Sequence, residues 1–144
     1  MPTLTRRRDQ EALHECWQVF FGDVCVGKIS ERAGLPTDVD QWAWTCGFFP
    51  LSHHGRRAEG IAMTFDRACA AFEAAWREYL PNCTDADFEA YRRQQAWTRW
   101  KFTMQELGRK LPTEVPEGRS RCFCGAVIDV ATMNRHVSTV HMAA

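Results

Sequence analysis

The chain has 144 residues, of which 45% are hydrophobic and 12% aromatic. This composition supplies enough apolar surface for a packed core, so it excludes a chain that is disordered throughout. Lys plus Arg and Asp plus Glu each number 18, which gives a formal net charge of zero. No overall basic excess therefore draws the whole protein to nucleic acid or to an anionic membrane.

The sequence contains no recognisable targeting or membrane segment. Residues 1–13 hold no apolar run of signal-peptide length, and no stretch approaches the ~20 apolar residues that a membrane helix needs. We therefore expect a cytoplasmic protein that does not bind a membrane. The seven cysteines are an odd number, and most of them should be free, buried thiols in a reducing compartment.

The first 15 residues are polar and charged. They include a basic run, Arg6 to Arg8. We interpret residues 1–15 as a flexible or helical arm. The basic run is either part of a solvated tail or a contact for phosphate groups.

Three strands are predicted from residue 16 onward. CWQVFF and VCVGKI are apolar, β-branched or aromatic runs that are separated by Gly22 and Asp23, which is a typical hairpin break. In QWAWTCGFF the bulky residues alternate with small or polar ones, which predicts a third strand with one aromatic face. Residues 50–60 contain breakers and are predicted to form a loop.

Two helices follow the strands. Residues 64–81 carry an apolar stripe of helical period, with Thr64 as the predicted N-cap and Pro81 as the stop. A second periodic segment runs from a cap at Thr84 to Gly108. Residues 16–108 are thus predicted to be an α+β body, a three-stranded antiparallel sheet covered by two helices. Residues 109–117 are predicted to be a linker, and residues 118–144 a small separate module.

The strand order and the segment GIAMTFDRACAAF at the start of the first helix loosely resemble small β-β-β-α domains. Such domains include the AP2-type DNA-binding domain and bacterial proteins with Trp-rich strands and a Gly-x-Ala-x-Thr-Phe helix start. The AP2 resemblance implies basic residues on the exposed sheet face. That face carries Gln18, Lys28, Gln41 and Thr45, which is too little positive charge for DNA binding. The resemblance therefore predicts the fold but not the function.

Four potential metal ligands lie close together near the end of the chain, namely Cys122, Cys124, His136 and His141. Zinc prefers four nitrogen or sulfur ligands in a tetrahedron, and two cysteines with two histidines form a common structural set. A tight turn can present the two thiolates, and one face of a helix can present the two imidazoles. The ligand types and their order therefore predict a zinc site.

This segment resembles the C2H2 zinc finger family. Ile128 and Met133 occupy the positions where that family places its apolar residues, and RHVSTVH resembles the end of a finger helix. The spacing departs from the family, because only Phe123 separates the cysteines where two to four residues are usual. We therefore expect a compressed first turn in place of a regular pair of strands.

The predicted zinc is structural. A catalytic zinc usually keeps one position open, whereas here four protein ligands fill the coordination shell. A module of this size buries too little apolar surface to fold alone, so the metal should supply its folding energy.

The finger resemblance implies three residues that read DNA. With His136 at position 7 of the finger helix, positions −1, 3 and 6 fall on Asp129, Thr132 and Arg135. Residues 109–144 hold five basic against three acidic residues, which is a small charge for phosphate binding.

The sequence leaves three functions open. The first is a non-enzymatic binding or adaptor protein with a protein partner. The second is a nucleic-acid-binding regulator that uses Arg135 and the run from Arg6 to Arg8. The third is an enzyme whose site includes His53 and His54, and a pocket with one of them beside a carboxylate would favour it. The sequence identifies no small-molecule substrate.

Overall fold

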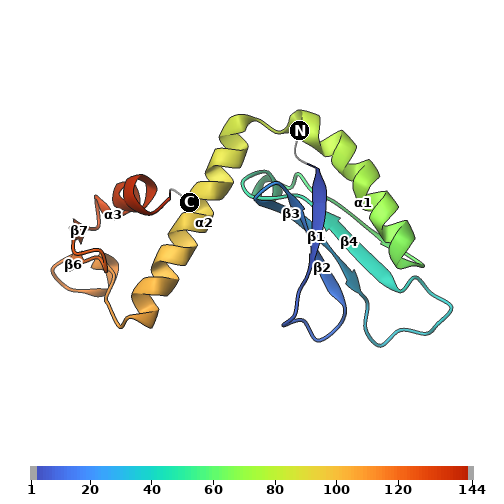
Figure 1. Cartoon of the computed structure of the whole chain (residues 1–144), viewed down its shortest axis with the longest axis horizontal. Helices are drawn as coiled ribbons and strands as arrows, with labels where there is room; N and C mark the ends of the chain where they lie inside the picture. The colour runs from blue at the N-terminus through green and yellow to red at the C-terminus, as the bar shows by residue number, and fades with distance from the viewer. Residues whose placement is uncertain (1–2, 143–144) are drawn as a thin grey trace. The chain divides into compact units, whose positions relative to one another are not determined.

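The computed structural model describes residues 3–142 (Figure 1). The chain forms two compact units, the first ending at Tyr91 and the second beginning at Arg92. The division falls within the longest helix, α2 (Asp85–Glu106). The sequence prediction instead placed all of this helix in the body, 16–108, and put the boundary at the linker, 109–117.

The first unit contains a five-stranded antiparallel sheet in the order β1-β2-β3-β4-β5. The fold class is α+β as predicted, but the predicted number of three strands is wrong. The strands are β1 (Leu4–Arg8), β2 (Cys16–Phe21), β3 (Val24–Glu31), β4 (Trp42–Cys46) and β5 (Ala58–Ala62).

Both additional strands lie at the edges of the sheet. β1 lies where a flexible or helical arm was expected, and it pairs from Leu4 opposite Phe21 to Arg8 opposite Trp17. β5 lies at the end of the predicted loop and pairs with β4. An edge strand has one neighbour only and often carries charged residues, so it shows little apolar alternation. The polar sequence of β1, LTRRR, hid its strand structure for this reason, whereas β5, AEGIA, has small residues and a glycine that resemble a loop.

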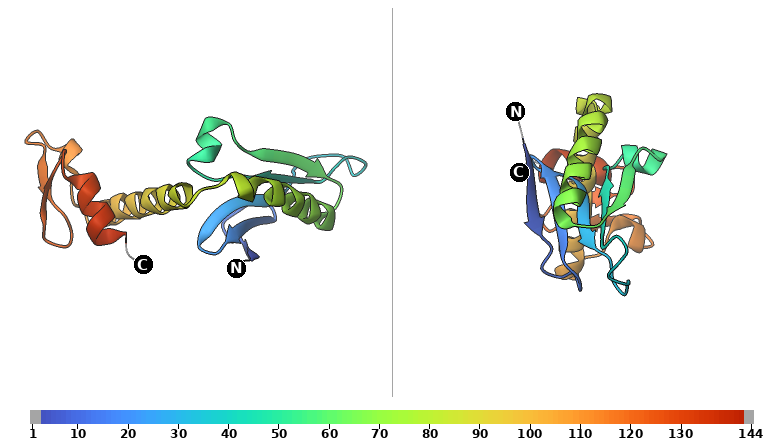
Figure 2. Two further views of the ribbon diagram at one scale, coloured as in Figure 1. Left: turned by 90° about the horizontal axis from the view of Figure 1, so that it is seen from above. Right: turned by 90° about the vertical axis from the view of Figure 1, so that its right-hand side faces the viewer.

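Helix α1 (Phe65–Tyr79) packs against β3, β4 and β5, and Figure 2 shows it alongside the sheet. The Thr64 side chain accepts a hydrogen bond from the Arg67 amide, as its predicted role as N-cap requires. Phe72 crosses β3 at Gly27, where a β-carbon would lie 2.7 Å from its ring. The short helices η1 (Leu51–His54) and η2 (Leu80–Asn82) complete this unit.

The core of the first unit lies between the sheet and α1. Phe48 belongs to a group of aromatic residues in this core, and the Phe48 ring stacks on Phe88 at the start of α2 with a centroid distance of 5.0 Å. The buried core residues are Val19, Val24, Val26, Ile29, Cys46, Phe48, Leu51, Ala62, Ala68, Phe72 and Trp76.

The second unit has its own small core. Its elements after α2 are η3 (Pro112–Glu114), β6 (Arg119–Arg121), β7 (Val127–Asp129), α3 (Met133–His136) and the π-helical η4 (Val137–His141). Three buried residues of α2, Ala96, Trp100 and Met104, pack with residues of the predicted zinc module. The partners from that module are Cys122, Ile128, Met133 and Val137.

In the described part of the chain, no helix has the length and apolar character needed to cross a membrane.

Candidate metal centre

The two cysteines lie in the turn between β6 and β7. These strands form a regular antiparallel pair, with Ser120 opposite Ile128. The expectation that a compressed turn would replace a regular pair of strands is therefore wrong. The Cys122 amide donates to the Ala126 carbonyl at 2.8 Å, and the Gly125 amide donates to the Cys122 carbonyl at 2.9 Å. Gly125 has a φ of 99°, a left-handed conformation that glycine adopts without a steric cost. The single intervening residue thus fits a turn closed by backbone hydrogen bonds.

The two histidines come from the last helical segment. His136 ends α3, and His141 ends the π-helical turn η4. A π-helix pairs residues five apart, which suits the spacing of these two side chains, and such turns occur frequently at functional sites. Their ring centroids are 4.9 Å apart. The loosened last turn therefore brings both imidazoles to one side of the helix.

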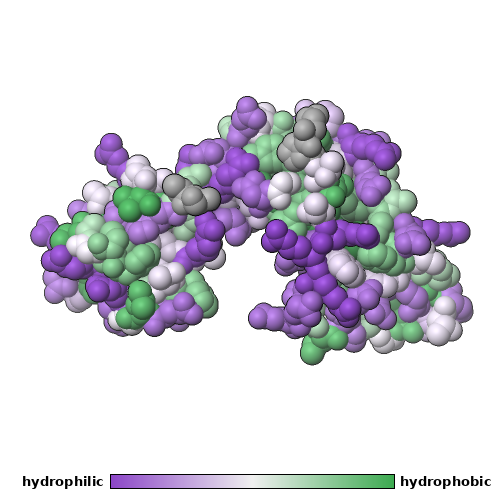
Figure 3. Space-filling model, viewed as in Figure 1, coloured by the Kyte–Doolittle hydropathy of each residue, from purple (hydrophilic) through white to green (hydrophobic). Residues whose placement is uncertain are grey.

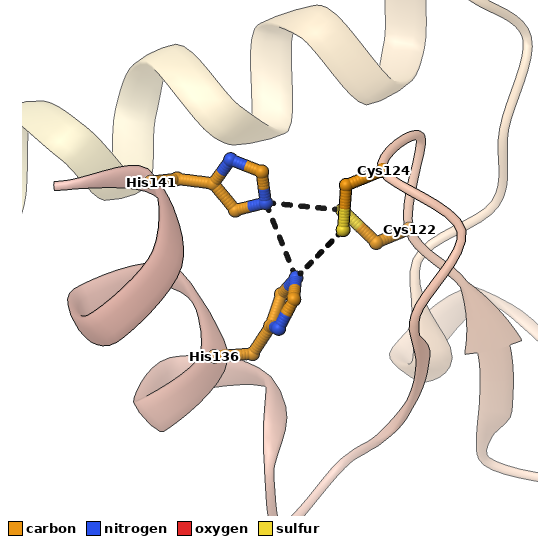
Figure 4. A group of neighbouring side chains, drawn as sticks. All are labelled: Cys122, Cys124, His136 and His141. Atoms are coloured by element: carbon orange, nitrogen blue, oxygen red, sulfur yellow. Dashed lines mark hydrogen bonds between the residues drawn. The ribbon is translucent and has the colours of Figure 1, made fainter. Parts of the chain in front are cut away.

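The four candidate ligand atoms lie within 4.8 Å of one another, and Figure 4 shows the side chains facing a common centre. The Nε2 atoms of His136 and His141 are 3.2 Å apart. The Cys122 Sγ lies 3.3 Å from the His141 Nε2, and the Cys124 Sγ lies 3.5 Å from the His136 Nε2.

These distances agree with a tetrahedral zinc site. Metal bonds of about 2.3 Å to sulfur and about 2.0 Å to nitrogen place two nitrogen ligands about 3.3 Å apart, and a nitrogen and a sulfur about 3.5 Å apart. Two imidazole nitrogens that both direct lone pairs at one point repel each other unless a proton or a cation lies between them. The arrangement can therefore hold one metal ion.

One side of the metal centre belongs to the core of the second unit. Cys122 is fully buried, whereas Cys124 is exposed. The indole Nε1 of Trp100, from α2, donates to the Cys122 Sγ at 3.2 Å, and this side chain is also buried. The Phe123 ring lies 4.9 Å from the His141 ring. The sequence predicts a helix from Thr84 to Gly108 but does not indicate this role for Trp100.

Burial, followed by the nearby His136, lowers the pKa of His141. A lower pKa favours the neutral imidazole, which is the form that binds a metal.

The three residues expected to read DNA lie beside the metal centre, but two of them are engaged with each other. The Asp129 Oδ1 accepts hydrogen bonds from the Thr132 amide at 2.8 Å and from its hydroxyl at 2.9 Å. The Thr132 Oγ1 in turn accepts from the Asp129 amide at 3.0 Å. These bonds lower the pKa of Asp129. Arg135 is exposed on α3.

The other candidate residues do not join this centre. The Arg6 Nη1 donates to the Cys69 Sγ at 2.9 Å, and its guanidinium lies 5.1 Å from the centroid of the Phe65 ring. Arg7 lies over the Phe20 ring at 4.8 Å. The basic run is thus part of the sheet surface of the first unit.

His53 and His54 are exposed at the end of η1, where the His53 ring contacts Phe49. A neighbouring hollow of about 430 Å³ includes Glu78 and Tyr79 among its lining residues, but neither histidine. A pocket with one of these histidines beside a carboxylate would have favoured an enzyme, and this hollow is not such a pocket.

Comparison of the chain with known protein families, with curated proteins and with solved structures finds no match.

Proposed function

We propose that this chain is a non-enzymatic binding protein whose second unit is held together by one structural zinc ion. The observation that carries the proposal is the convergence of two thiol sulfurs and two imidazole nitrogens within 4.8 Å. Two sulfur and two nitrogen ligands at tetrahedral distances favour zinc over magnesium or calcium, which prefer oxygen ligands.

The role proposed for this zinc is structural and not catalytic. Four protein ligands complete a tetrahedron, so no position is left for a water molecule or a substrate. The buried residues that the hairpin, α3 and η4 supply to the core are only four in number. Such a core is too small to fold this segment without additional cross-links, and a metal provides them.

The proposed activity is adaptor binding. Val127, Val130 and Val140 are each more than half exposed on the second unit. Figure 3 shows hydrophobic side chains among hydrophilic ones on the visible face of that unit. Exposed apolar side chains close to a rigid metal centre favour a protein partner as the first candidate.

A nucleic acid is the second candidate partner, because the exposed Arg135 can reach a base edge or a phosphate. Base contacts by Asp129 and Thr132 would require them to give up the hydrogen bonds between them. We therefore assign the finger helix at most one base-reading side chain.

Metal analysis tests the proposal. Wild-type protein, purified without chelator, should contain one zinc per chain by elemental analysis. Cys122→Ser should lose the zinc, whereas the control Cys16→Ser should retain it, because Cys16 lies on β2 outside the cluster. Wild-type protein with reduced cysteines and no stoichiometric zinc would refute the structural zinc.

A further inference from the structure

The neutral net charge of the chain conceals opposite charges on its two units. Residues 1–91 contain nine basic and 14 acidic residues, whereas residues 92–144 contain nine basic and four acidic ones. The first unit is thus about −5 and the second about +5. All nine basic side chains of the second unit are exposed. A charge of this size on 53 residues attracts polyanions even though the whole chain is neutral.

Part of this charge lines a hollow of about 630 Å³ within the second unit. One face of α2 contributes Thr98, Lys101, Phe102 and Gln105, and the turn after the helix contributes Arg109 and Lys110. The buried residues Trp100 and Met104 belong to a different face of the same helix. The hollow is therefore separate from the core and from the metal ligands.

Backbone hydrogen bonds fix the turn that carries Arg109 and Lys110. Gly108 has a φ of 70°, its amide donates to the Gln105 carbonyl, and the Arg109 amide donates to the Met104 carbonyl at 2.9 Å. This pattern is a Schellman motif, in which the Met104 and Gln105 carbonyls at the end of the helix accept backbone hydrogen bonds. Among the described residues that line the hollow, Glu114 carries the one carboxylate, and it accepts a hydrogen bond from the Leu111 amide at 2.9 Å.

Phe102 adds an aromatic surface to this basic hollow. Its side chain is 61% exposed, although burial of a phenyl ring is normally favourable. An exposed ring beside several cations is the arrangement with which proteins bind unpaired bases, because the ring stacks on a base while the cations contact phosphates. In a duplex the bases are already stacked on each other and cannot cover this ring.

We propose that the hollow formed by α2 and the turn after it binds single-stranded nucleic acid. Lys101, Arg109 and Lys110 contact successive phosphates, Phe102 stacks on a base, and Thr98 and Gln105 supply hydrogen bonds. This inference rests on the proposed function, because the zinc centre holds together the unit to which α2 contributes. It gives that binding protein a nucleic-acid ligand in addition to the proposed protein partner.

Fluorescence anisotropy with a labelled 12-nucleotide oligothymidylate tests the proposal on the full, zinc-loaded chain. Three phosphate contacts predict that log K falls against log salt with a slope of about −2, because each contact on a single strand contributes about −0.7. Lys101→Gln combined with Lys110→Gln should bring the slope to about −0.7. Phe102→Leu should weaken binding about tenfold at fixed salt and leave the slope unchanged.

The control is Arg67→Gln combined with Arg77→Gln. It removes the same charge from exposed positions on α1 in the first unit and should change neither quantity. A zinc-loaded wild type that does not bind the oligonucleotide overturns the inference, as does full affinity in Phe102→Leu. Tighter binding to a 12-base-pair duplex that is lost in Arg135→Gln also overturns it, in favour of the finger helix.

Zinc content is measured on the same samples. Zinc-loaded protein that fails to bind overturns only the nucleic-acid inference, whereas protein that contains no zinc overturns the proposed structural zinc.

Discussion

The hydrogen bond from the Trp100 indole to the Cys122 sulfur yields a quantitative prediction for Trp100→Phe. A phenyl ring keeps most of the apolar contact at this buried position but cannot donate the bond, which is 3.2 Å long. Hydrogen bonds to charged groups contribute about 1.5–3 kcal/mol, and loss of an outer partner of a metal ligand typically lowers metal affinity about 10- to 100-fold. The two ranges agree, because about 1.4 kcal/mol corresponds to a factor of ten.

The assay is a zinc competition titration with a chromophoric chelator. We expect Trp100→Phe to bind zinc about 10- to 100-fold more weakly than the wild type. With cobalt in place of zinc, the sulfur-to-metal charge-transfer band should also shift, because the sulfur loses a donor.

Trp97→Phe is the matched control. Trp97 stacks on Trp100 at a centroid distance of 5.3 Å, is only partly buried, and loses the same ring atoms in the substitution. It should therefore leave zinc affinity nearly unchanged. Equal zinc affinity of Trp100→Phe and the wild type would show that the indole hydrogen bond does not strengthen zinc binding by Cys122, and this would refute the prediction.

Three further predictions concern stability and thiol chemistry. Met104→Ala should destabilise the second unit by about 2–5 kcal/mol in urea unfolding of the zinc-loaded protein, because Met104 is buried. Leu107 is exposed, so Leu107→Ala should change the stability by at most about 0.5 kcal/mol. Equal effects of the two substitutions would show that Met104 is not a core residue. Gly27→Ala should destabilise the first unit by about 3 kcal/mol or more, because the new methyl group would clash with the Thr45 backbone oxygen and with the Phe72 ring, and an unchanged unfolding midpoint would contradict this packing. Burial raises the pKa of Cys46 to about 12 and, with Asp87 adding to the effect, that of Cys83 to about 11. A raised pKa keeps each cysteine in the unreactive thiol form at pH 8, so both should resist alkylation in the folded protein and react faster only as the pH rises toward 11. Peptide mass spectrometry measures the extent of alkylation, and rapid labelling of Cys83 at pH 8 would contradict the prediction.

The prediction for Cys83 differs from what its sequence position suggests. It directly precedes the capped start of α2, where a thiolate is usually stabilised. In the structure its Sγ lies 3.5 Å from the Tyr79 carbonyl in a partly buried position, and the nearby Asp87 carboxylate also opposes a negative charge. Desolvation therefore outweighs the effect of the helix end.

The parts of the fold that the sequence predicted are those with strong local periodicity. The alternation in β4, the apolar stripe and cap of α1, and the Gly108 stop after α2 all depend on short-range patterns that the structure reproduces. The edge strands β1 and β5 were missed because their pairing depends on partners distant in sequence. Their own residues show no clear period.

The ligand cluster was predictable because it depends on spacing within about 20 residues. The structure gathers all four predicted ligand side chains. The role of Trp100 was not predictable in the same way, because helical spacing alone does not distinguish a core tryptophan from one that donates to a sulfur 22 residues later. A usable signal existed, since a buried indole N–H generally needs an acceptor, but the sequence does not say which one.

The π-helical turn that carries His141 links metal binding to the backbone conformation. An ordinary α-helix turns about 100° per residue, so five residues would rotate His141 about 140° away from the side that His136 faces. The two histidines converge in the loosened form of this turn. A bound metal would therefore select one of two helical registers for Val137–His141. Loss of the metal would free the end of the chain to return to the other.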